Sequence, residues 1–312
     1  NYLEIKGNSD HSKLIAMLEE LNDYSVSIDT VLSDHFDVEN LTYWMAFQIL
    51  TGNSDTQNRN TYLYSPLNSD TWYFISWDND GALMKTENSL KDYSDQSSWE
   101  RGVSNYWGNV LFQRCLKSDT FREALGRAVE DLKDKFDHDT VEKMLQSYAA
   151  VIKPYVYAMP DAMNAPLTSE QYDQVAAAIP DEIEQNYEAY KESLKKPMPF
   201  YIGVPSVKND KLKLNWDVSY DFDAEEITYS VEVASDYQFQ NVIYSSYGQT
   251  MPEAEMDVPE AGQYFVRVKA TNAAGYTQDA FDYYVIDTGK VYGVKCFYIQ
   301  PDGTVVEDIY EE

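Results

Sequence analysis

Long apolar runs are missing from this chain of 312 residues. No stretch approaches the roughly 18 apolar residues in a row that a transmembrane helix needs, so no membrane span is expected. The first residues also lack the basic and then apolar pattern of a secretory signal. Asn1 therefore looks like a cut rather than a natural start, and we expect part of the natural protein to lie upstream.

Residues for disulfide and metal chemistry are also scarce. The two cysteines, Cys115 and Cys296, fall in regions of different character, so we expect neither a disulfide nor a thiolate metal site. The three histidines, His11, His35 and His138, show no ligand spacing. We interpret them as ordinary surface or half-buried side chains.

Basic residues are few as well: 24 Lys and Arg stand against 53 Asp and Glu, a net charge of −29. Such a charge repels phosphate backbones and anionic headgroups, which argues against nucleic-acid and membrane-surface binding and favours cations as partners. The hydrophobic fraction of 44% is ordinary, so the chain is expected to be folded rather than a disordered polyacid. Its length predicts about two domains.

Helical periodicity dominates the first two thirds of the chain. Apolar side chains spaced i, i+3, i+4 and i+7 from Leu14 predict an amphipathic helix over residues 9–22. A helix that begins after Asp37 should end at Gly52, and Pro180 should divide or kink the last helix. The further helices are expected within residues 37–51 and near 119–136, 139–157 and 168–194.

A short β-hairpin is expected inside this helical region. Two aromatic runs, residues 60–65 and 72–77, are separated by turn-forming residues such as Pro66 and Asp70. The polar stretch over residues 86–106 is expected to be a loop.

The remaining residues alternate between apolar and polar side chains, which is typical of an antiparallel sandwich. A final hairpin over 288–312 should turn at Pro301–Gly303 and either extend the sandwich or begin another module. The expected fold class is thus multidomain α+β, with a mainly helical part followed by an all-β part. Strands are expected at Lys211–Trp216, Ile227–Ala234, Asn241–Ser246, Tyr264–Thr271 and Phe281–Ile286.

The spacing of acids and amides around the hairpin suggests phosphoryl transfer. In kinase-like sites one Asp accepts the proton of the attacking hydroxyl, an Asn further along the loop holds a divalent ion, and a later Asp bridges metal and phosphates. Asp55, Asn60 and Asp78 would take these roles, and Asp80 adds a second carboxylate near the ion. Mg²⁺ suits such a site because it keeps waters and phosphates as ligands.

Two other interpretations of this segment stay open. An Asp-Asn-Asp-Gly run is often only a polar turn. The same run also resembles a Ca²⁺ loop that starts at Ser76, with ligands from Asp78, Asp80 and Glu87 and a glycine at Gly81. Against Ca²⁺, the first position is not Asp, and the preceding residues predict a strand where the motif needs a helix.

Read as a whole, residues 49–64 and 72–81 resemble the spore-coat CotH kinase family, a divergent branch of the protein kinase-like folds. The shared pattern is Asn-x-Asp at Asn53–Asp55, a downstream Asn before an aromatic strand, and Trp-Asp-x-Asp at Trp77–Asp80. The opening residues 2–8 and parts of 110–125 are also similar. The resemblance covers about residues 1–196.

By this resemblance Asp55 is the catalytic aspartate and Asp78 the magnesium aspartate, with Asn60 and Asp80 as further ligands of Mg²⁺ and ATP. The family's phosphate-holding N-terminal lobe precedes the part present here, and Lys6 is the only nearby base. We therefore expect the chain to bind Mg²⁺–ATP weakly or not at all without that lobe.

The resemblance implies a protein kinase that acts on Ser or Thr of secreted, coat or surface proteins, located outside the cell or at its surface. The alternative is a non-catalytic anchoring protein with a vestigial kinase-like scaffold. Carbohydrate binding by exposed aromatic residues is a weaker third hypothesis, since most aromatics fall at core spacing.

Residues 212–217, 229–234 and 262–272 together resemble a fibronectin type III domain. By that resemblance Trp216 and Tyr264 belong to the core of its sandwich. The expected domains are a kinase-like C-terminal lobe at 1–196, a fibronectin type III-like sandwich at 197–287 and a hairpin extension at 288–312.

Overall fold

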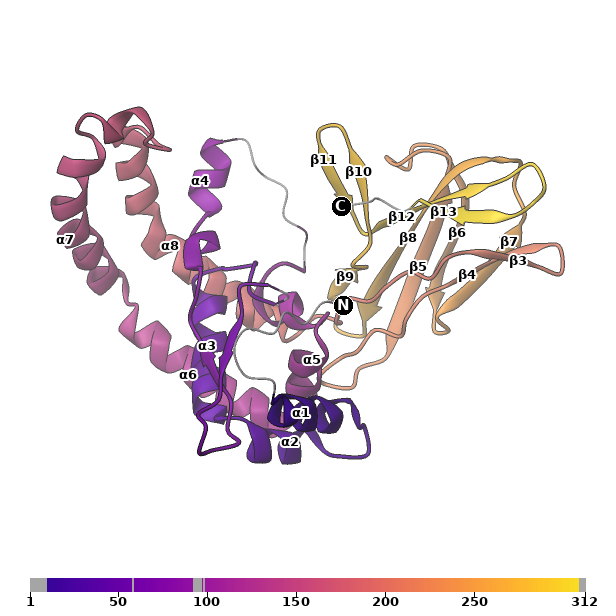
Figure 1. Cartoon of the computed structure of the whole chain (residues 1–312). Helices are drawn as coiled ribbons and strands as arrows, with labels where there is room; N and C mark the ends of the chain where they lie inside the picture. Colours follow the sequence, from indigo (N-terminus) through magenta and orange to yellow (C-terminus); the bar gives the residue numbers. More distant parts are fainter. Residues whose placement is uncertain (1–9, 58, 92–96, 98, 309–312) are drawn as a thin grey trace. The chain divides into compact units, whose positions relative to one another are not determined.

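The structure is a computed structural model that describes residues 10–57, 59–91, 97 and 99–308. The chain forms two compact units, the first from residues 1–93 and 105–190 and the second from 94–104 and 191–312. The first is mainly helical and the second is all β, as the predicted α+β fold class requires (Figure 1). Within the described residues, no helix combines the length and apolar character that crossing a bilayer demands.

The predicted helices are present, with ends shifted by a few residues. Asp37 caps α3 as expected, because its Oδ1 accepts the Asn40 N–H at 2.9 Å. The helices of the described residues are α1 (Ser12–Asn22), α2 (Ile28–His35), α3 (Val38–Leu50), α4 (Lys85–Leu90), α5 (Val110–Lys117), α6 (Asp119–Lys135), α7 (His138–Val156) and α8 (Ser169–Ser193).

Three predictions for this region need correction. Pro180 does not divide the last helix, because α8 continues through this residue and is 25 residues long. The N–H group that proline lacks removes only one backbone hydrogen bond from the helix. The expected loop over 86–106 contains most of α4 and the 3₁₀ turn η2 (Gly102–Tyr106). Leu18 of the predicted apolar stripe is 42% exposed, although Met17 and Leu21 are buried.

Aromatic rings fill the core of the helical unit around α3. Trp44 of α3 lies 4.7 Å from Phe74 and 5.8 Å from Phe112 between ring centroids. Tyr106 meets Phe112 edge to face at 5.2 Å. Because Phe74 belongs to β2 (Tyr73–Ile75), this cluster attaches the short β-hairpin to the helices.

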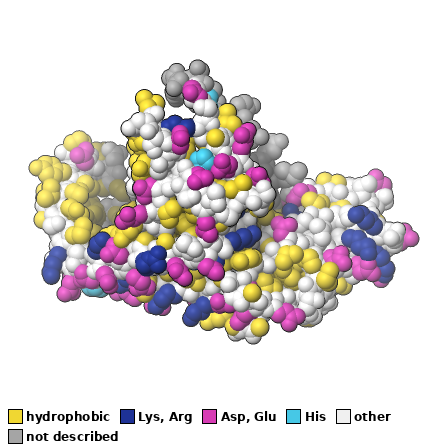
Figure 2. Space-filling view, turned by 90° about the horizontal axis from the view of Figure 1, so that it is seen from below, with side chains coloured by type: hydrophobic (Ala, Val, Ile, Leu, Met, Phe, Trp, Pro, Cys, Tyr) yellow, Lys and Arg dark blue, Asp and Glu magenta, His cyan; other side chains and the backbone are white. Residues whose placement is uncertain are grey.

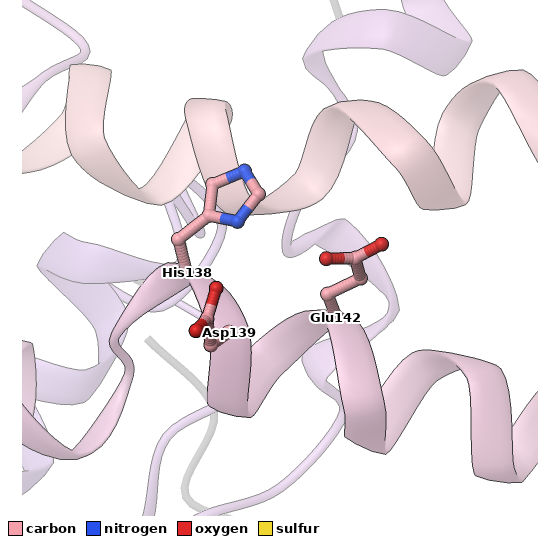
Figure 3. A group of neighbouring side chains, drawn as sticks. All are labelled: His138, Asp139 and Glu142. Carbon is pink, nitrogen blue, oxygen red and sulfur yellow. The ribbon is translucent and has the colours of Figure 1, made fainter.

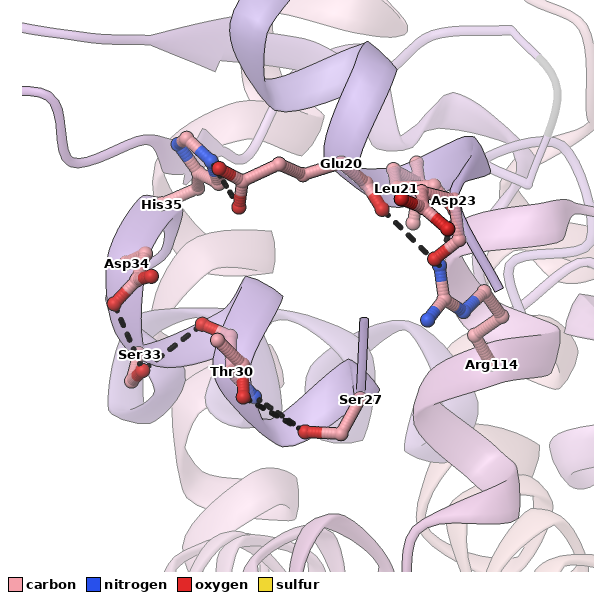
Figure 4. Close-up of polar contacts among 9 residues, drawn as sticks. All are labelled: Glu20, Leu21, Asp23, Ser27, Thr30, Ser33, Asp34, His35 and Arg114. Atoms are coloured by element: carbon pink, nitrogen blue, oxygen red, sulfur yellow. Dashed lines mark hydrogen bonds and ion pairs between the residues drawn. The ribbon is translucent and has the colours of Figure 1, made fainter. Parts of the chain in front are cut away.

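Arg114 of α5 fixes the end of α1. Its buried guanidinium donates to the Leu21 carbonyl, to the Glu20 and Asp23 carbonyls at 3.4 Å each, and to the Val26 carbonyl at 2.5 Å. Figure 4 shows the side chain directed at this turn from the neighbouring helix. One side chain thus satisfies carbonyls that a helix end leaves without intrahelical partners.

The all-β unit is a sandwich of two antiparallel sheets. One sheet has the order β13-β12-β8-β5-β6, and β9 pairs with the C-terminal part of β8 in the same sheet. The other sheet has the order β3-β4-β7. A separate hairpin pairs β10 with β11. The strands are β3 (Ser206–Lys208), β4 (Lys211–Asn215), β5 (Ile227–Ala234), β6 (Val242–Gln249), β7 (Glu253–Asp257), β8 (Gly262–Asn272), β9 (Thr277–Asp279), β10 (Tyr283–Ile286), β11 (Gly289–Tyr292), β12 (Val294–Ile299) and β13 (Val305–Glu307).

The core of the sandwich lies between the two sheets. Trp216 and Tyr264 belong to it, 4% and 9% exposed. The hairpin of β12 and β13 extends the larger sheet, because β12 pairs with β8 along its whole length. Sequence periodicity missed β3, β9 and β11, which have only three or four residues, and β7, whose Glu-Ala-Glu-Met-Asp alternates but consists mostly of residue types that are depleted in strands.

The strand β6 lies at the edge of the larger sheet and pairs on one side with β5. Its eight residues include no charged side chain, and Val242, Ile243 and Tyr247 are exposed. The opposite edge is β13, a strand of three residues.

The cysteines are buried free thiols, Cys115 in the helical unit and Cys296 in the sandwich. Burial raises the pKa of the Cys296 thiol to about 11 and shifts that of Cys115 in the same direction. Both thiols are therefore protonated and poorly nucleophilic at neutral pH.

Candidate functional site

Two loops of the helical unit meet at one end of the β-hairpin. The first site loop, residues 51–61, joins α3 to β1 (Tyr62–Tyr64), and the second site loop, residues 76–84, follows β2. Because Tyr62 pairs with Ile75 in the antiparallel register, the start of β1 and the end of β2 lie side by side. The hairpin therefore brings together two segments about twenty residues apart, as the sequence predicted.

Gly52 sets the direction in which the first site loop leaves α3. Its φ of +64° is in the left-handed region, and a Cβ there would lie 2.7 Å from Nδ2 of Asn186. That amide of α8 donates to the Leu50 carbonyl at 3.1 Å. A glycine is thus required both by the backbone conformation and by the close approach of α8.

Buried amides connect the two site loops. Gln48 and Asn53 are at most 2% exposed, and each donates to Oδ1 of Asn79, at 3.1 and 3.5 Å. Oδ1 of Asn53 in turn accepts the Asp55 N–H at 3.2 Å. A Cβ on Gly81 would lie 3.0 Å from this same oxygen, so the second site loop is packed directly onto the first.

Asp55 and Asn60 are in direct contact. Nδ2 of Asn60 donates to Oδ2 of Asp55 at 2.8 Å, and Nε of Arg59 lies 3.3 Å from Oδ1. The Asp55 side chain keeps 45% of its surface exposed. The carboxylate is therefore oriented by neighbours from its own loop and is still accessible to a substrate.

Asp78 and Asp80 lie in the second site loop, where both are exposed. Asp78 has φ 52° and ψ 57° and precedes the 3₁₀ turn η1 (Asn79–Gly81). Asn60 and Leu83 also have positive φ, 55° and 56°. Left-handed conformations are costly for residues other than glycine and gather at functional sites.

The carboxylates of the two loops do not form a closed cluster. Across the described part of the chain, Asp55, Asp78 and Asp80 are not a group in which all three have a carboxylate oxygen within 4.8 Å of the other two. The three acids of the Ca²⁺ alternative, Asp78, Asp80 and Glu87, do not gather either. Glu87 instead pairs with Lys91 at 2.5 Å on α4.

A tighter group of possible ligands lies elsewhere, at the start of α7. His138, Asp139 and Glu142 have one ligand atom each within 4.8 Å of the others. All three side chains are exposed on the helix surface (Figure 3). Solvated groups at successive turns of a helix commonly lie this close without an ion, so the interpretation of His138 as a surface residue stands.

Sequence reasoning missed the buried amide of Gln48 and the half-buried amide of Asn79. Asn79 is the variable position of the Trp-Asp-x-Asp pattern, and Gln48 falls on the apolar face predicted for α3. A polar residue at a core position was the available signal, because such a group needs a hydrogen-bonding partner. Residues 2–8, including Lys6, lie outside the described residues.

Comparisons with known proteins agree with the motif. A family model described as CotH kinase protein matches residues 2–190. No curated protein sequence matches the chain. Among solved structures, one similar chain is the twitchin kinase region of C. elegans, at 15% identity, over 31% of this chain and 19% of that chain, with a TM-score of 0.20. The match thus spans less than a fifth of the twitchin chain.

Proposed function

The chain belongs to the CotH kinase family, whose model covers more than half of it, and from this premise we propose that the two site loops transfer the γ-phosphoryl group of ATP to a protein hydroxyl. The observation that carries the proposal is the contact between Asp55 and Asn60, five residues apart, beside the loop of Asp78. A base and a metal-binding amide at this spacing are what phosphoryl transfer needs.

Asp55 is the proposed general base. Its Oδ2 accepts a hydrogen bond from the Asn60 amide, and the Arg59 guanidinium forms an ion pair with Oδ1. These two contacts hold the carboxylate in one orientation. Its exposed surface leaves room for a Ser or Thr hydroxyl to approach. Asp55 accepts the proton of that hydroxyl as the oxygen attacks the γ-phosphorus.

The residues present fit a magnesium ion held with few protein ligands. Asp78 and Asp80 offer exposed carboxylates, and the Asn60 amide offers an oxygen. Their open arrangement suits Mg²⁺, which keeps waters and phosphate oxygens among its ligands, better than a closed Ca²⁺ site. When bound, the ion neutralises charge on the β- and γ-phosphates. Asp78 and Asn60 are also the proposed nucleotide ligands.

An aromatic pair supports a nucleotide as the second substrate. The rings of Tyr62 and Trp77 are 5.0 Å apart, and both side chains are more than half exposed. Tyr62 lies two residues after Asn60, and Trp77 directly precedes Asp78. We expect the two rings to stack on the nucleobase, since base–aromatic stacking contributes about 1–3 kcal/mol per base.

The proposed acceptors are Ser or Thr residues of secreted, coat or surface proteins, and the proposed location of the protein is outside the cell or at its surface. The sandwich is proposed to be a fibronectin type III-like module that acts as a spacer or binding surface. Its two-sheet arrangement, with Trp216 and Tyr264 in the core, supports this assignment.

Phosphotransfer is tested in the full-length protein with radiolabelled ATP, Mg²⁺ and a Ser/Thr-rich acceptor protein. Asp55→Asn keeps the size of the side chain but removes the base, so we expect transfer to fall by at least about 100-fold. Asp139→Asn, at an exposed site on α7, is the matched control and should transfer normally. Equal transfer by Asp55→Asn and the wild type would remove Asp55 from the mechanism.

A second candidate is a non-catalytic scaffold, which the open arrangement of Asp55, Asp78 and Asp80 also permits. In the full-length protein it predicts no transfer by the wild type and no effect of ATP with Mg²⁺ on thermal unfolding. For the same full-length protein the kinase proposal predicts an upward shift of the melting temperature that Asp78→Asn removes.

A further inference from the structure

A group of three charged side chains in the sandwich is largely shielded from solvent. Lys295 of β12 has its Nζ 3.1 Å from Oδ1 of Asp282 and 2.5 Å from Oε1 of Glu307 of β13. The side chains of Lys295, Asp282 and Glu307 are 14%, 9% and 32% exposed. By contrast, the ion pair of Lys211 and Asp257 on the other sheet leaves its side chains 44% and 91% exposed.

The strand register directs this group toward the inside of the sandwich. Phe297, two residues after Lys295, is fully buried in the core between the sheets, so Lys295 lies on the same, inward side of β12. Phe297 pairs directly with Glu307, which therefore shares that side. Phe281, next to Asp282, packs on Trp99 with ring centroids 5.1 Å apart.

Burial makes the charged form of this group costly. Two carboxylates share one ammonium, and desolvation raises the pKa of the Asp282 carboxyl above its usual range, which favours its neutral form. Burial opposes the charge on Lys295 too, but the hydrogen bond with Glu307 and the nearby Asp282 outweigh it and raise its pKa. Replacing an ammonium and a carboxyl by one neutral amide would remove the buried charges.

We propose that Lys295 and Asp282 form an intramolecular isopeptide bond, with Glu307 as the proton-transfer group. Nζ of Lys295 lies 3.1 Å from Oδ1 of Asp282, the oxygen bonded to the Cγ that it would attack, so the two groups are held in the contact from which such a bond forms. The bond would link the strand β12 covalently to the segment that precedes β10, across one side of the sandwich core.

The reaction is a condensation that needs no further reactant. Glu307 takes one proton from the Lys295 ammonium, and the neutral Nζ attacks Cγ of the protonated Asp282 carboxyl. The Cγ–Oδ1 bond then breaks, and Oδ1 leaves as water with its own proton and a second proton from Nζ. The third proton remains on the amide, Glu307 keeps the first, and the net charge is unchanged.

A backbone donor is present where negative charge develops. The Ile202 N–H donates to Oδ2 of Asp282 at 2.7 Å. During the attack Oδ2 carries the charge of the tetrahedral intermediate, and a fixed N–H at this distance stabilises it as an oxyanion-hole donor does. Oδ1, which faces Lys295, is then the oxygen that leaves.

The test is the intact mass of the purified 312-residue chain under denaturing conditions, followed by peptide mapping. The wild type should be lighter than its sequence by one water, and digestion should give a branched peptide that joins Asp282 and Lys295. Lys295→Arg, Asp282→Ala and Glu307→Gln should restore the sequence mass. Lys211→Arg, in the exposed ion pair, is the matched control and should still lack one water.

Two outcomes would overturn the proposal. One is a wild-type chain at its full sequence mass with Lys295 in a linear peptide. The other is a water loss that maps to a cyclic imide at Asp80-Gly81 or Asp302-Gly303. Because the bond is detected after denaturation, a wild-type result does not depend on how well the variants fold, and tryptophan fluorescence of Glu307→Gln reports whether its core is intact.

Discussion

At the scale of single residues, the site depends on backbone positions that only certain side chains allow. Asn60, Asp78 and Leu83 all adopt left-handed conformations within one short region. The resemblance to a family pointed to Asp55, Asn60 and Asp78 from the sequence, but their conformations and the Asn79 amide were not predictable, because both depend on contacts between segments distant in sequence.

Gly52→Ala is expected to destabilise the helical unit. The new Cβ would both occupy a left-handed conformation and lie 2.7 Å from Nδ2 of Asn186. We expect a loss of about 1–3 kcal/mol in urea unfolding. In an Asn186→Ala background the steric part disappears, so Gly52→Ala should cost less there. An equal cost in both backgrounds would show that Asn186 does not restrict this position.

Tyr190 should make stability sensitive to alkaline pH. Burial, with Glu130 and Tyr187 nearby, raises its pKa from 10.0 to about 12. Between these values the unfolded chain loses its phenol proton and the folded chain keeps it, so stability is complete below pH 10 and falls as pH rises toward 12. Two pKa units correspond to about 2–3 kcal/mol.

The free energy of unfolding is measured with denaturant at about pH 8, where the phenol is protonated in both states, and at about pH 11, where it is protonated only in the folded state. Tyr190→Phe should lose less stability between the two pH values than the wild type. Tyr155→Phe, at a residue that is 72% exposed, serves as the control and should behave like the wild type. The same loss in all three proteins would exclude Tyr190 as the source.

At the scale of elements, apolar periodicity predicted the long helices and the well-alternating strands. It missed α4, because the sequence Lys-Thr-Glu-Asn-Ser-Leu has almost no apolar face. It also missed α2, although the Ser27 cap and the apolar residues Val31 and Leu32 were signals for a helix there. α4 is held by a distant contact instead: the Lys85 N–H donates to Glu182 of α8 at 2.9 Å. Such contacts between elements are not encoded in local patterns.

Arg114→Met should uncouple the end of α1 from α5. The methionine fills part of the space but donates no hydrogen bond, so buried carbonyls after α1 lose their partner. We expect a loss of roughly 2–4 kcal/mol, since each unsatisfied buried group costs about 1–3 kcal/mol. Urea unfolding followed by circular dichroism measures it.

The control for this change is Arg127→Met on α6. Arg127 forms a long ion pair of 4.0 Å with Glu123, and its side chain is 72% exposed. A change within about 0.5 kcal/mol is expected there. If Arg114→Met were equally mild, the hydrogen bonds to the turn after α1 would have little energetic importance.

At the scale of the whole molecule, the charge of −29 is the dominant property. Acidic and basic side chains are interspersed on the face drawn in Figure 2, so the excess is not confined to one patch there. The amino-acid composition alone predicted this net charge. The assignment of residues 94–104 to the β unit was not predictable, because it depends on packing such as that of Trp99 on Phe281.

Added salt should therefore raise the melting temperature. Screening weakens the mutual repulsion of carboxylates in the compact state, and most of the effect should be reached by about 0.15 M NaCl. At equal ionic strength, MgCl₂ should add a further increase that Asp78→Asn abolishes, because a bound ion stabilises the folded state. An identical response of wild type and Asp78→Asn to MgCl₂ would argue against a magnesium site at this residue.

The uncharged edge strand β6 has a practical consequence near the isoelectric point of about 4.3. At neutral pH, long-range repulsion between molecules keeps such edges from meeting, whereas the strand itself has no charged side chain to oppose pairing and only its two register shifts against β5 interrupt it. As the solution is acidified that repulsion vanishes, and Val242–Gln249 becomes the surface on which chains can join strand to strand. The tendency of this protein to aggregate should therefore depend strongly on the pH of its buffer. A single lysine introduced on β6 should reduce aggregation during storage at low pH.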